Sequence, residues 1–396
     1  MRVLIVTVGS RGDVAPYTGL AARLRAAGHA VAIATHDPFA TLVGGTGCEF
    51  RPLPGDPRTI LDAAALSVRV VPRVVRYLDA VGAALPDAVR PGVDVLVTGA
   101  ATAPLVGHLG AGLGVPVLGA YLQPAHPTRA FPPPVSSVRS LGGFGNWMSA
   151  RAVRAVVDGF SAPAVRTLRS RLGLAPGGTI APPPVVYGFS PAVLPPPTDW
   201  PSDLRAVGYW WPEPPADWRP PPPLAGFLAA GDPPVHVGLG SLGDAPRARR
   251  FAGLAVRELR RRGFRVLVQG SVDAEPADDG VLLLGDVPHE RLFPHVAAVL
   301  HHAGAGTTAA ALRAGVPTVP VPVQADQHLW ARRAVQLTVA PGALRLRTAT
   351  PEQVADAVTA AVGDPRYRAG ARRLAAILAA EDGAAAVLDM VDRLGQ

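Results

Sequence analysis

The residues with the clearest chemical potential lie between positions 301 and 327, in the sequence HHAGAGTTAAALRAGVPTVPVPVQADQ. An apolar run from Val296 to Leu300 leads into two histidines and a turn of small residues, and the pattern AAALRAG then predicts a helix. In such a strand, turn and helix, free backbone N–H groups and the positive end of the helix dipole face outward at the turn. That arrangement suits a phosphate or a diphosphate.

A polar pair closes the same stretch. Gly315 and Pro317 stop the helix, and PTVPVPV predicts a strand that delivers Asp326 and Gln327 to its end. Ligands of open α/β sheets bind at the carboxyl ends of strands, where a carboxylate beside an amide can bind sugar hydroxyls. A simpler interpretation is also open: any α/β protein has turns that contain glycine, and the two histidines can be hydrogen-bonded core residues.

The beginning of the chain predicts a similar unit. Val3 to Val8 is a continuous apolar run, as expected for a parallel strand buried on both faces. The turn at 9–12 follows, Asp13 can then cap a helix that continues to about Ala27, and residues 30–34 predict a second strand. The turn does not have the spacing GxGxxG, so NAD is not expected.

Strands and helices alternate along the rest of the chain, which is the pattern of doubly wound α/β domains. Strands are predicted at 93–98, 115–118, 235–239, 266–269 and 281–284, and helices at 57–90 with a break or kink, 103–112, 146–172, 248–262, 351–363 and 366–394. Residues 124–146 predict a long loop, and the Pro- and Trp-rich residues 191–223 predict a stiff connector. A chain of 396 residues is long enough for two domains.

The composition excludes several classes of protein. The formal charge of +8 comes from arginine alone and raises the question of nucleic acid. The arginines are dispersed, however, and the densest group, at 247–265, lies on one amphipathic helix, so no nucleic acid is expected. Cys48 is the only cysteine, which excludes an internal disulfide and a cysteine metal site. No stretch predicts a signal peptide or a membrane span, and we expect a soluble, cytoplasmic monomer or homodimer.

These motifs together resemble the nucleotide-sugar signature of the family 1 glycosyltransferases. The segments that carry the resemblance are HHAGAGTT, AGVPTVPVP, the pair DQ, the opening VTVGSRGDVAPYTGLAARLRAAGHAVAIATH, the middle GYWWPEPPADWRPPP, GLGS at 238–241 and PHERLFPHVAAVLHHAGAGTT. The nearest kind is the bacterial natural-product and sterol glycosyltransferases of the GT-B fold, including those that glycosylate glycopeptide antibiotics.

The resemblance implies an α/β protein of the GT-B fold, in which two doubly wound, Rossmann-like parallel-sheet domains face one another across a cleft. Residues 1–215 would form the acceptor-binding domain and end in the Pro- and Trp-rich linker. Residues 216–380 would form the nucleotide-sugar-binding domain. A C-terminal helix within 381–396 would pack back on the first domain.

The resemblance also implies roles for single residues. Asp13 falls at the position of the catalytic base, Asp326 and Gln327 at the donor-sugar pair, and Val287 at a nucleoside contact. The positions near the donor diphosphate are Ser10, Ser241, His302, Gly304, Ala305, Gly306 and Thr307. No DxD pair stands at a strand end, so no metal and no other cofactor is expected. From the residues alone, Asp13 is equally an N-cap, and there the helix dipole would lower its pKa and make it a poorer base.

The chain departs from the family pattern at several positions. Ala303 replaces a glycine, Ser271 and Arg291 stand where many relatives have tryptophan, and Ala310 stands where plant relatives have a glutamate that binds the ribose. Both UDP-linked and dTDP-linked donors are therefore expected to fit.

The expected activity is metal-independent, inverting transfer of a sugar to a lipophilic, natural-product-like acceptor, as in antibiotic biosynthesis. The alternatives are a GT-B nucleotide-sugar epimerase or hydrolase, and a non-catalytic protein that binds nucleotide sugars or polyanions.

Overall fold

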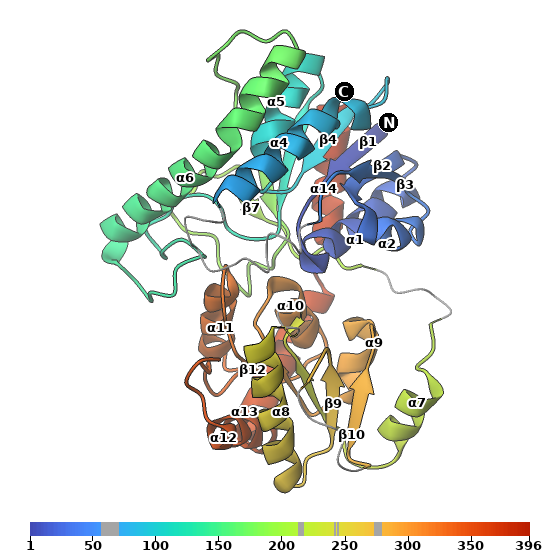
Figure 1. The fold of residues 1–396 in the computed structure, drawn as a ribbon, viewed down its shortest axis with the longest axis vertical. Helices are drawn as coiled ribbons and strands as arrows, with labels where there is room; N and C mark the ends of the chain where they lie inside the picture. The colour runs from blue at the N-terminus through green and yellow to red at the C-terminus, as the bar shows by residue number, and fades with distance from the viewer. Residues whose placement is uncertain (57–70, 213–217, 241–242, 244, 273–278) are drawn as a thin grey trace. The chain divides into compact units, whose positions relative to one another are not determined.

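The structure is a computed structural model that describes residues 1–56, 71–212, 218–240, 243, 245–272 and 279–396. The chain forms two compact units. The first unit contains residues 1–133, 138–213 and 381–396, and the second contains residues 134–137 and 214–380. In each unit helices pack around a sheet, as Figure 1 shows. The last residues of the chain thus belong to the first unit.

The first unit is built on a parallel sheet with the strand order β3-β2-β1-β4-β5-β6-β7 within the described residues. These strands are β1 (Arg2–Val6), β2 (Ala30–His36), β3 (Glu49–Leu53), β4 (Val95–Thr98), β5 (Val117–Tyr121), β6 (Val185–Tyr187) and β7 (Arg205–Ala206). In β1, Val3 and Ile5 enter one core, and Leu4 and Val6 enter the other. This alternation explains why β1 reads as an unbroken apolar run.

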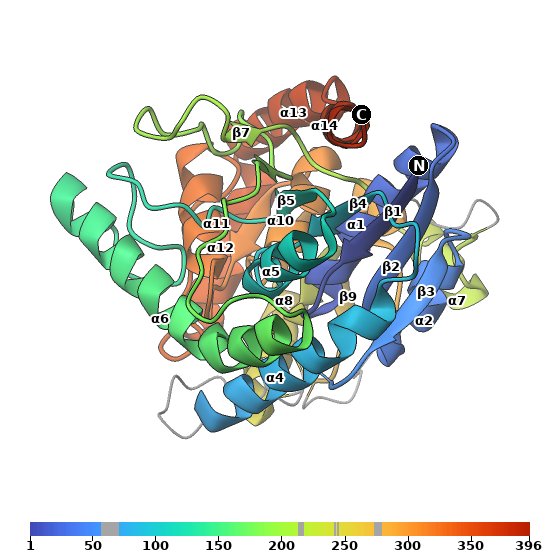
Figure 2. The same ribbon diagram turned by 90° about the horizontal axis from the view of Figure 1, so that it is seen from above.

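Helices cover both faces of this sheet. They are α1 (Arg11–Ala26), η1 (Asp37–Phe39), α2 (Ala40–Gly44), α4 (Val71–Ala88), α5 (Ala103–Leu113), α6 (Gly142–Arg171) and α14 (Gly383–Leu394). Residues of α1, α2 and α14 share the core of Val3 and Ile5, whereas residues of α4, α5 and α6 share the core of Leu4 and Val6. Figure 2 shows α4, α5 and α6 on the same side of the sheet.

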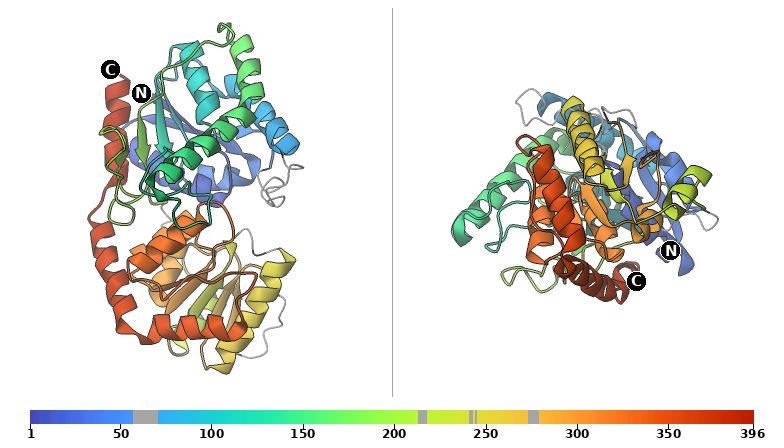
Figure 3. Two further views of the ribbon diagram at one scale, coloured as in Figure 1. Left: turned by 90° about the vertical axis from the view of Figure 1, so that its left-hand side faces the viewer. Right: turned by 90° about the horizontal axis from the view of Figure 1, so that it is seen from below.

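Helix α14 is fixed to the first unit by apolar and polar contacts. Val387 and Val391 are fully buried in the core beside β1. The Trp210 Nε1–H donates to the Gly383 carbonyl at 3.3 Å, and the Ser190 hydroxyl donates to Glu381 Oε1 at 2.6 Å. Figure 3 shows the two termini of the chain next to each other at this helix. The helix is therefore an integral layer of the first unit.

The second unit is built on a smaller parallel sheet with the order β10-β9-β8-β11-β12 among the described strands. They are β8 (Val235–Gly238), β9 (Val266–Gln269), β10 (Val281–Leu284), β11 (Ala298–His301) and β12 (Thr318–Pro320). The helices are α7 (Pro222–Ala229), α8 (Pro246–Arg261), α9 (His289–Leu292), η3 (Phe293–His295), α10 (Ala305–Arg313), α11 (Gln327–Gln336), α12 (Pro351–Gly363) and α13 (Pro365–Ala379). Helices α8 and α12 share one core with the sheet, and α7, α9 and α10 share the other.

Several predicted elements need correction. The strand predicted at 317–323 ends at Pro320, and the Val321 N–H makes the last hydrogen bond to β11, because the Val323 N–H donates to the Gln327 side chain instead. The helix predicted at 366–394 is two helices, since the Asp382 side chain accepts a hydrogen bond from the Ala385 N–H and starts α14. Residues 57–70, in the first half of the helix predicted at 57–90, lie outside the described residues.

Other differences concern elements that the sequence did not predict. Strands β3, β6 and β7 are short pieces without an alternating pattern. Helix α7, at 222–229, begins within the last two residues of the connector predicted at 191–223, and Trp200 and Trp210 of that connector are buried. No helix in the described parts of the chain is both long and apolar enough to cross a membrane.

Candidate active site

The strand order reverses once in each sheet, and the predicted site residues follow the strands at these points. In the first unit the reversal lies between β1 and β4, and Ser10 and Asp13 follow β1. In the second unit it lies between β8 and β11, and His302 follows β11. Such switch points are where open α/β sheets bind ligands.

The turn after β11 presents backbone donors. Gly304 is the N-cap of α10, and the first hydrogen bond of the helix runs from the Thr308 N–H to the Gly304 carbonyl at 2.9 Å. The N–H groups of Ala305, Gly306 and Thr307 therefore have no partner within the helix. Gly306 is exposed, and an added Cβ there would meet no atom within 4 Å. The turn can bind a phosphate through N–H groups and the helix dipole.

Two glycines enclose the imidazole ring of His302. A Cβ on Gly304 would lie 2.4 Å from His302 Nε2, and a Cβ on Gly240 would lie 2.6 Å from His302 Cε1. Gly240 belongs to the loop after β8 and has a φ of 59°, a conformation that glycine adopts without strain. The loops after β8 and β11 thus converge on this ring.

His302 is held neutral. Burial lowers the pKa of this half-buried imidazole from 6.5 to about 4. Within the described residues neither His302 Nδ1 nor the hydroxyl of Thr308 has a hydrogen-bond partner, although both atoms are buried. Buried polar atoms normally have partners, and a bound ligand is one way to supply them. A neutral imidazole offers one N–H donor.

Ala303 takes a conformation that is unusual for alanine. Its φ is 62°, its side chain is fully buried, and its N–H donates to His301 Nδ1 at 3.1 Å. The methyl group that replaces the glycine of relatives therefore lies in the protein interior. Its cost is backbone strain at a left-handed position, on the order of 1 kcal/mol.

A hydrogen-bonded network of side chains backs this turn. Gln269 Oε1, at the end of β9, lies 3.2 Å from His236 Nε2 and 2.8 Å from His289 Nε2. Burial lowers the pKa of His236 to about 3 and moves the pKa of His301 well below its usual value. The complete burial of His301 supports the interpretation that this histidine is a core residue.

Asp326 and Gln327 begin helix α11 rather than ending a strand. Asp326 is the N-cap, and its Oδ2 accepts a hydrogen bond from Trp330 Nε1 at 2.5 Å. The buried Gln327 side chain accepts from the N–H groups of Val323 and Gln324 at 2.8 and 3.0 Å through Oε1. The pair is thus rigidly oriented, and the Gln327 amide nitrogen is the donor that remains for a ligand hydroxyl.

The other predicted donor residues are placed differently. Val287 is 6% exposed and packs in the core with Leu292 and Phe293, so its side chain is not available to a nucleoside. Ala310 lies in the same core on α10. Ser241 lies outside the described residues.

Asp13 is the third residue of α1, not its N-cap. Ser10 is the N-cap, and its N–H and its hydroxyl both donate to Asp13 Oδ2 at 2.8 Å. This reciprocal capping box corrects the predicted helix start. Asp13 Oδ1 accepts no hydrogen bond from the residues that the structure describes. The carboxylate is fixed through one oxygen, which leaves the other for a ligand.

Burial raises the pKa of Asp13 above its usual value, against the opposing effect of the two hydrogen bonds from Ser10. The sequence suggested that the helix dipole would make Asp13 a weak base. Desolvation of the charged form is the larger effect, because a dipole contributes about 0.3–1 kcal/mol at an exposed site and burial can contribute several. Asp13 is therefore placed and tuned to accept a proton.

The structure thus brings His302, Gly304, Ala305, Gly306 and Thr307 together at one turn, and Ser10 and Asp13 together at another. Sequence reasoning missed Gly240, because its contact with His302 joins two loops that are far apart in the chain. Among the described residues no group of His, Cys, Asp and Glu side chains is arranged to hold a metal ion.

Comparison with known proteins gives the family. Residues 269–394 match the model of the erythromycin biosynthesis protein CIII-like C-terminal domain, and residues 3–85 match the glycosyltransferase family 28 N-terminal domain. The chain is 36% identical to O-mycaminosyltylonolide 6-deoxyallosyltransferase of Streptomyces fradiae over 97% of its own length and 95% of that relative.

The chain belongs to the family 1 GT-B glycosyltransferases. It is also 31% identical to the sterol 3-beta-glucosyltransferase UGT80B1 of Arabidopsis thaliana, over 99% of this chain and 68% of that protein. Two solved structures have the same fold over the whole chain. The glycotransferase of kitacinnamycin has a TM-score of 0.77 and 21% identity, and the match covers 99% of that chain. The glycosyltransferase VinC in complex with dTDP has a TM-score of 0.74 and 20% identity, and the match covers 99% of that chain. The predicted GT-B fold and glycosyltransferase activity are confirmed.

Proposed function

We propose that this glycosyltransferase transfers a sugar from a UDP- or dTDP-linked donor to a lipophilic small molecule, with inversion and without a metal ion. The proposal is carried mainly by one observation. The half-buried, neutral imidazole of His302, whose buried Nδ1 has no hydrogen-bond partner among the described residues, lies at a turn whose helix offers three N–H groups without a partner within the helix. A nucleotide diphosphate is the ligand that would satisfy these donors together.

The turn after β11 would stabilise the leaving group. As the bond between the anomeric carbon and the diphosphate oxygen breaks, its electron pair stays on the diphosphate. Hydrogen bonds from His302 and from the N–H groups of Ala305, Gly306 and Thr307 would become stronger as this charge develops. Because these donors are fixed before the reaction, they need no reorganisation during it.

Asp13 would act as the general base. The acceptor oxygen or nitrogen attacks the anomeric carbon on the side opposite the diphosphate, and Asp13 Oδ1 takes the proton that it loses. The raised pKa improves the carboxylate as a base, and the hydrogen bonds from Ser10 keep it oriented. A single displacement of this kind inverts the anomeric configuration.

The remaining roles follow from the relatives and from the polar pair. Gln327, and Asp326 beside it, would bind donor-sugar hydroxyls at the start of α11.

The names of two relatives specify a macrolide-type and a sterol acceptor, which supports a lipophilic acceptor here. Ala310 provides no carboxylate for the ribose, and VinC is solved with dTDP, which together support a thymidine nucleotide beside a uridine one.

Nucleotide binding tests this assignment directly. Calorimetry with UDP and dTDP, in the presence of EDTA, is expected to give micromolar or tighter binding that His302→Ala weakens at least tenfold. NMR of the product formed from an α-linked donor is expected to show a β-linkage. The proposal fails if neither nucleotide binds, and the inverting step fails if the anomeric configuration is retained.

A further inference from the structure

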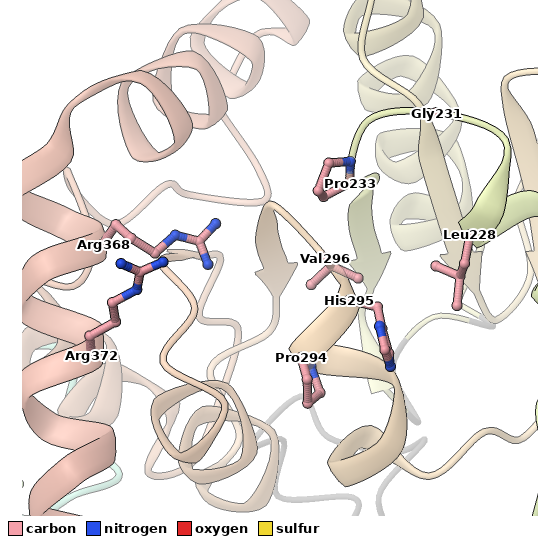
Figure 4. A pocket seen from close by; sticks show the side chains of 8 residues that line it. All are labelled: Leu228, Gly231, Pro233, Pro294, His295, Val296, Arg368 and Arg372. Atoms are coloured by element: carbon pink, nitrogen blue, oxygen red, sulfur yellow. The ribbon is translucent and has the colours of Figure 1, made fainter.

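A hollow lies in the second unit, at the end of the sheet where β8 and β11 begin. Its volume is about 440 Å³, and it is lined by Leu228, Gly231, Pro233, Pro294, His295, Val296, Arg368 and Arg372. Figure 4 shows the two arginines reaching toward it from one helix, with His295 among the residues on the other side. None of the lining side chains is acidic.

Arg368 is held in place by the backbone. Its Nη2 donates to the Ala297 carbonyl at 2.5 Å, and its Nη1 donates to the Gly315 carbonyl at 3.5 Å. Burial and the neighbouring Arg372 both lower the pKa of this guanidinium. Two backbone carbonyls orient the group, and no carboxylate in the described parts of the chain forms an ion pair with it.

Arg372 follows one helical turn later on α13, so the two cationic side chains lie on the same face. Within the described parts of the chain, Arg372 makes no hydrogen bond and no ion pair, and it is exposed at the hollow. Two like charges one turn apart destabilise a helix slightly, and an anion between them would turn that repulsion into attraction. His295 can add an imidazole donor.

We propose that this hollow binds a small oxyanion of the phosphate class, such as inorganic phosphate or a phosphate monoester. Planar guanidinium groups match the oxygens of such anions, and the hollow is large enough to hold one. The prolines and Val296 provide a rigid rim that restricts the site to a small ligand.

The site is distinct from the turn at His302. Pro233 and Val296 precede β8 and β11, whereas Gly240 and His302 follow these strands. A strand of four residues is roughly 13 Å long, so one anion cannot reach both ends. The two sites share β11 and α10, because Arg368 contacts the residues before β11 and after α10. The inference does not depend on the proposed donor site.

Calorimetry of the full chain with inorganic phosphate, against sodium chloride at matched ionic strength, tests the proposal. Four variants separate the possibilities: Arg372→Gln, Arg372→Lys, the adjacent exposed Arg373→Gln as a matched control, and His302→Ala. Phosphate binding is expected to weaken about tenfold or more in Arg372→Gln and less in Arg372→Lys. Arg373→Gln should bind phosphate as the parent chain does, and in His302→Ala the part of the binding that Arg372→Gln removes should persist.

Three outcomes would overturn the proposal. The first is phosphate binding that His302→Ala abolishes and Arg372→Gln leaves intact, which would assign the anion to the turn after β11. The second is equal loss in the Arg372→Gln and Arg373→Gln variants, which would indicate a diffuse effect of helix charge. The third is no heat of binding beyond that of chloride. Because Arg372 is exposed, its substitution should leave the melting temperature nearly unchanged, and melting curves check this.

Discussion

Replacing Asp13 by asparagine should affect the rate of sugar transfer and the stability of the fold differently. Asp13→Asn should lower the rate of sugar transfer by about 10²–10⁴, since an amide cannot accept the proton, while nucleotide affinity stays nearly constant. Its stability should not fall, because the amide oxygen still accepts hydrogen bonds from Ser10 and a desolvated charge is removed. Enzyme kinetics, calorimetry and thermal melts measure these quantities. The exposed Asp87→Asn is the matched control, and undiminished turnover of Asp13→Asn would leave Asp13 a capping role only.

The raised pKa of Asp13 also sets a pH dependence. The protonated form is favoured in the folded state, so the contribution of Asp13 to stability is complete below the pKa of the unfolded chain and is lost as the pH rises through the folded pKa. The difference in melting temperature between Asp13→Asn and the parent chain should therefore shift in favour of the variant as the pH rises from 4 to 8. A constant difference over that range would contradict the assigned burial.

The Gly304→Ala variant tests how the imidazole of His302 is positioned. Its φ and ψ of −62° and 147° suit any residue, so Gly304→Ala should cause no backbone strain. The new methyl group would instead meet His302 Nε2 at 2.4 Å and displace the ring. Nucleoside diphosphate affinity should fall about tenfold or more in calorimetry. Gly342→Ala, whose Cβ would meet no atom within 4 Å, should leave the affinity unchanged.

At the scale of single elements, the histidines of the second sheet should make that unit sensitive to acid. The pKa values of His236 and His302 are lowered to about 3 and about 4 in the folded state. The unfolded chain takes up protons first, so stability is constant above pH 6.5 and falls below it, by up to about 1.4 kcal/mol per pH unit for each group. Hydrogen exchange of β8 and β11 between pH 7.5 and 4.5 should show this loss, and His236→Gln should reduce its slope. A flat profile would contradict the neutral cluster.

Helix α14 should be sensitive to one methyl group. A Cβ on Gly383 would lie 2.4 Å from the Gly208 carbonyl oxygen, so Gly383→Ala must displace the start of the helix. The first unit should lose about 1–3 kcal/mol in urea unfolding followed by tryptophan fluorescence. Gly363→Ala, which ends α12 and meets no atom within 4 Å, is the control. Equal stability of the two variants would show that α14 is not held through this contact.

Across the whole molecule, the sequence predicted best what local chemistry determines. The turn from His302 to Thr307 and the strands at 266–269 and 281–284 were predicted because an apolar run followed by glycines has few other structures. The start of α1 was mispredicted although Ser10 and Asp13 have capping-box spacing, since either residue alone can cap a helix.

Contacts between distant loops could not be predicted. The enclosure of His302 by Gly240, the burial that raises the pKa of Asp13, and the approach of Arg368 to β11 all depend on tertiary packing. Sequence pattern specifies which residues follow each strand, whereas the sheet order decides which of these ends lie side by side. This is why the sequence predicts the turn after β11 but not the contact of His302 with Gly240.

The most direct test of the central claim is transfer itself. The full chain is incubated with dTDP- and UDP-sugars, EDTA and a panel of lipophilic acceptors, and products are measured by mass spectrometry together with released nucleoside diphosphate. We predict a sugar–acceptor adduct formed in equal amount to the nucleoside diphosphate, and loss of both with Asp13→Asn. Release or epimerisation of the donor without any acceptor, or no turnover of either donor, would contradict the account.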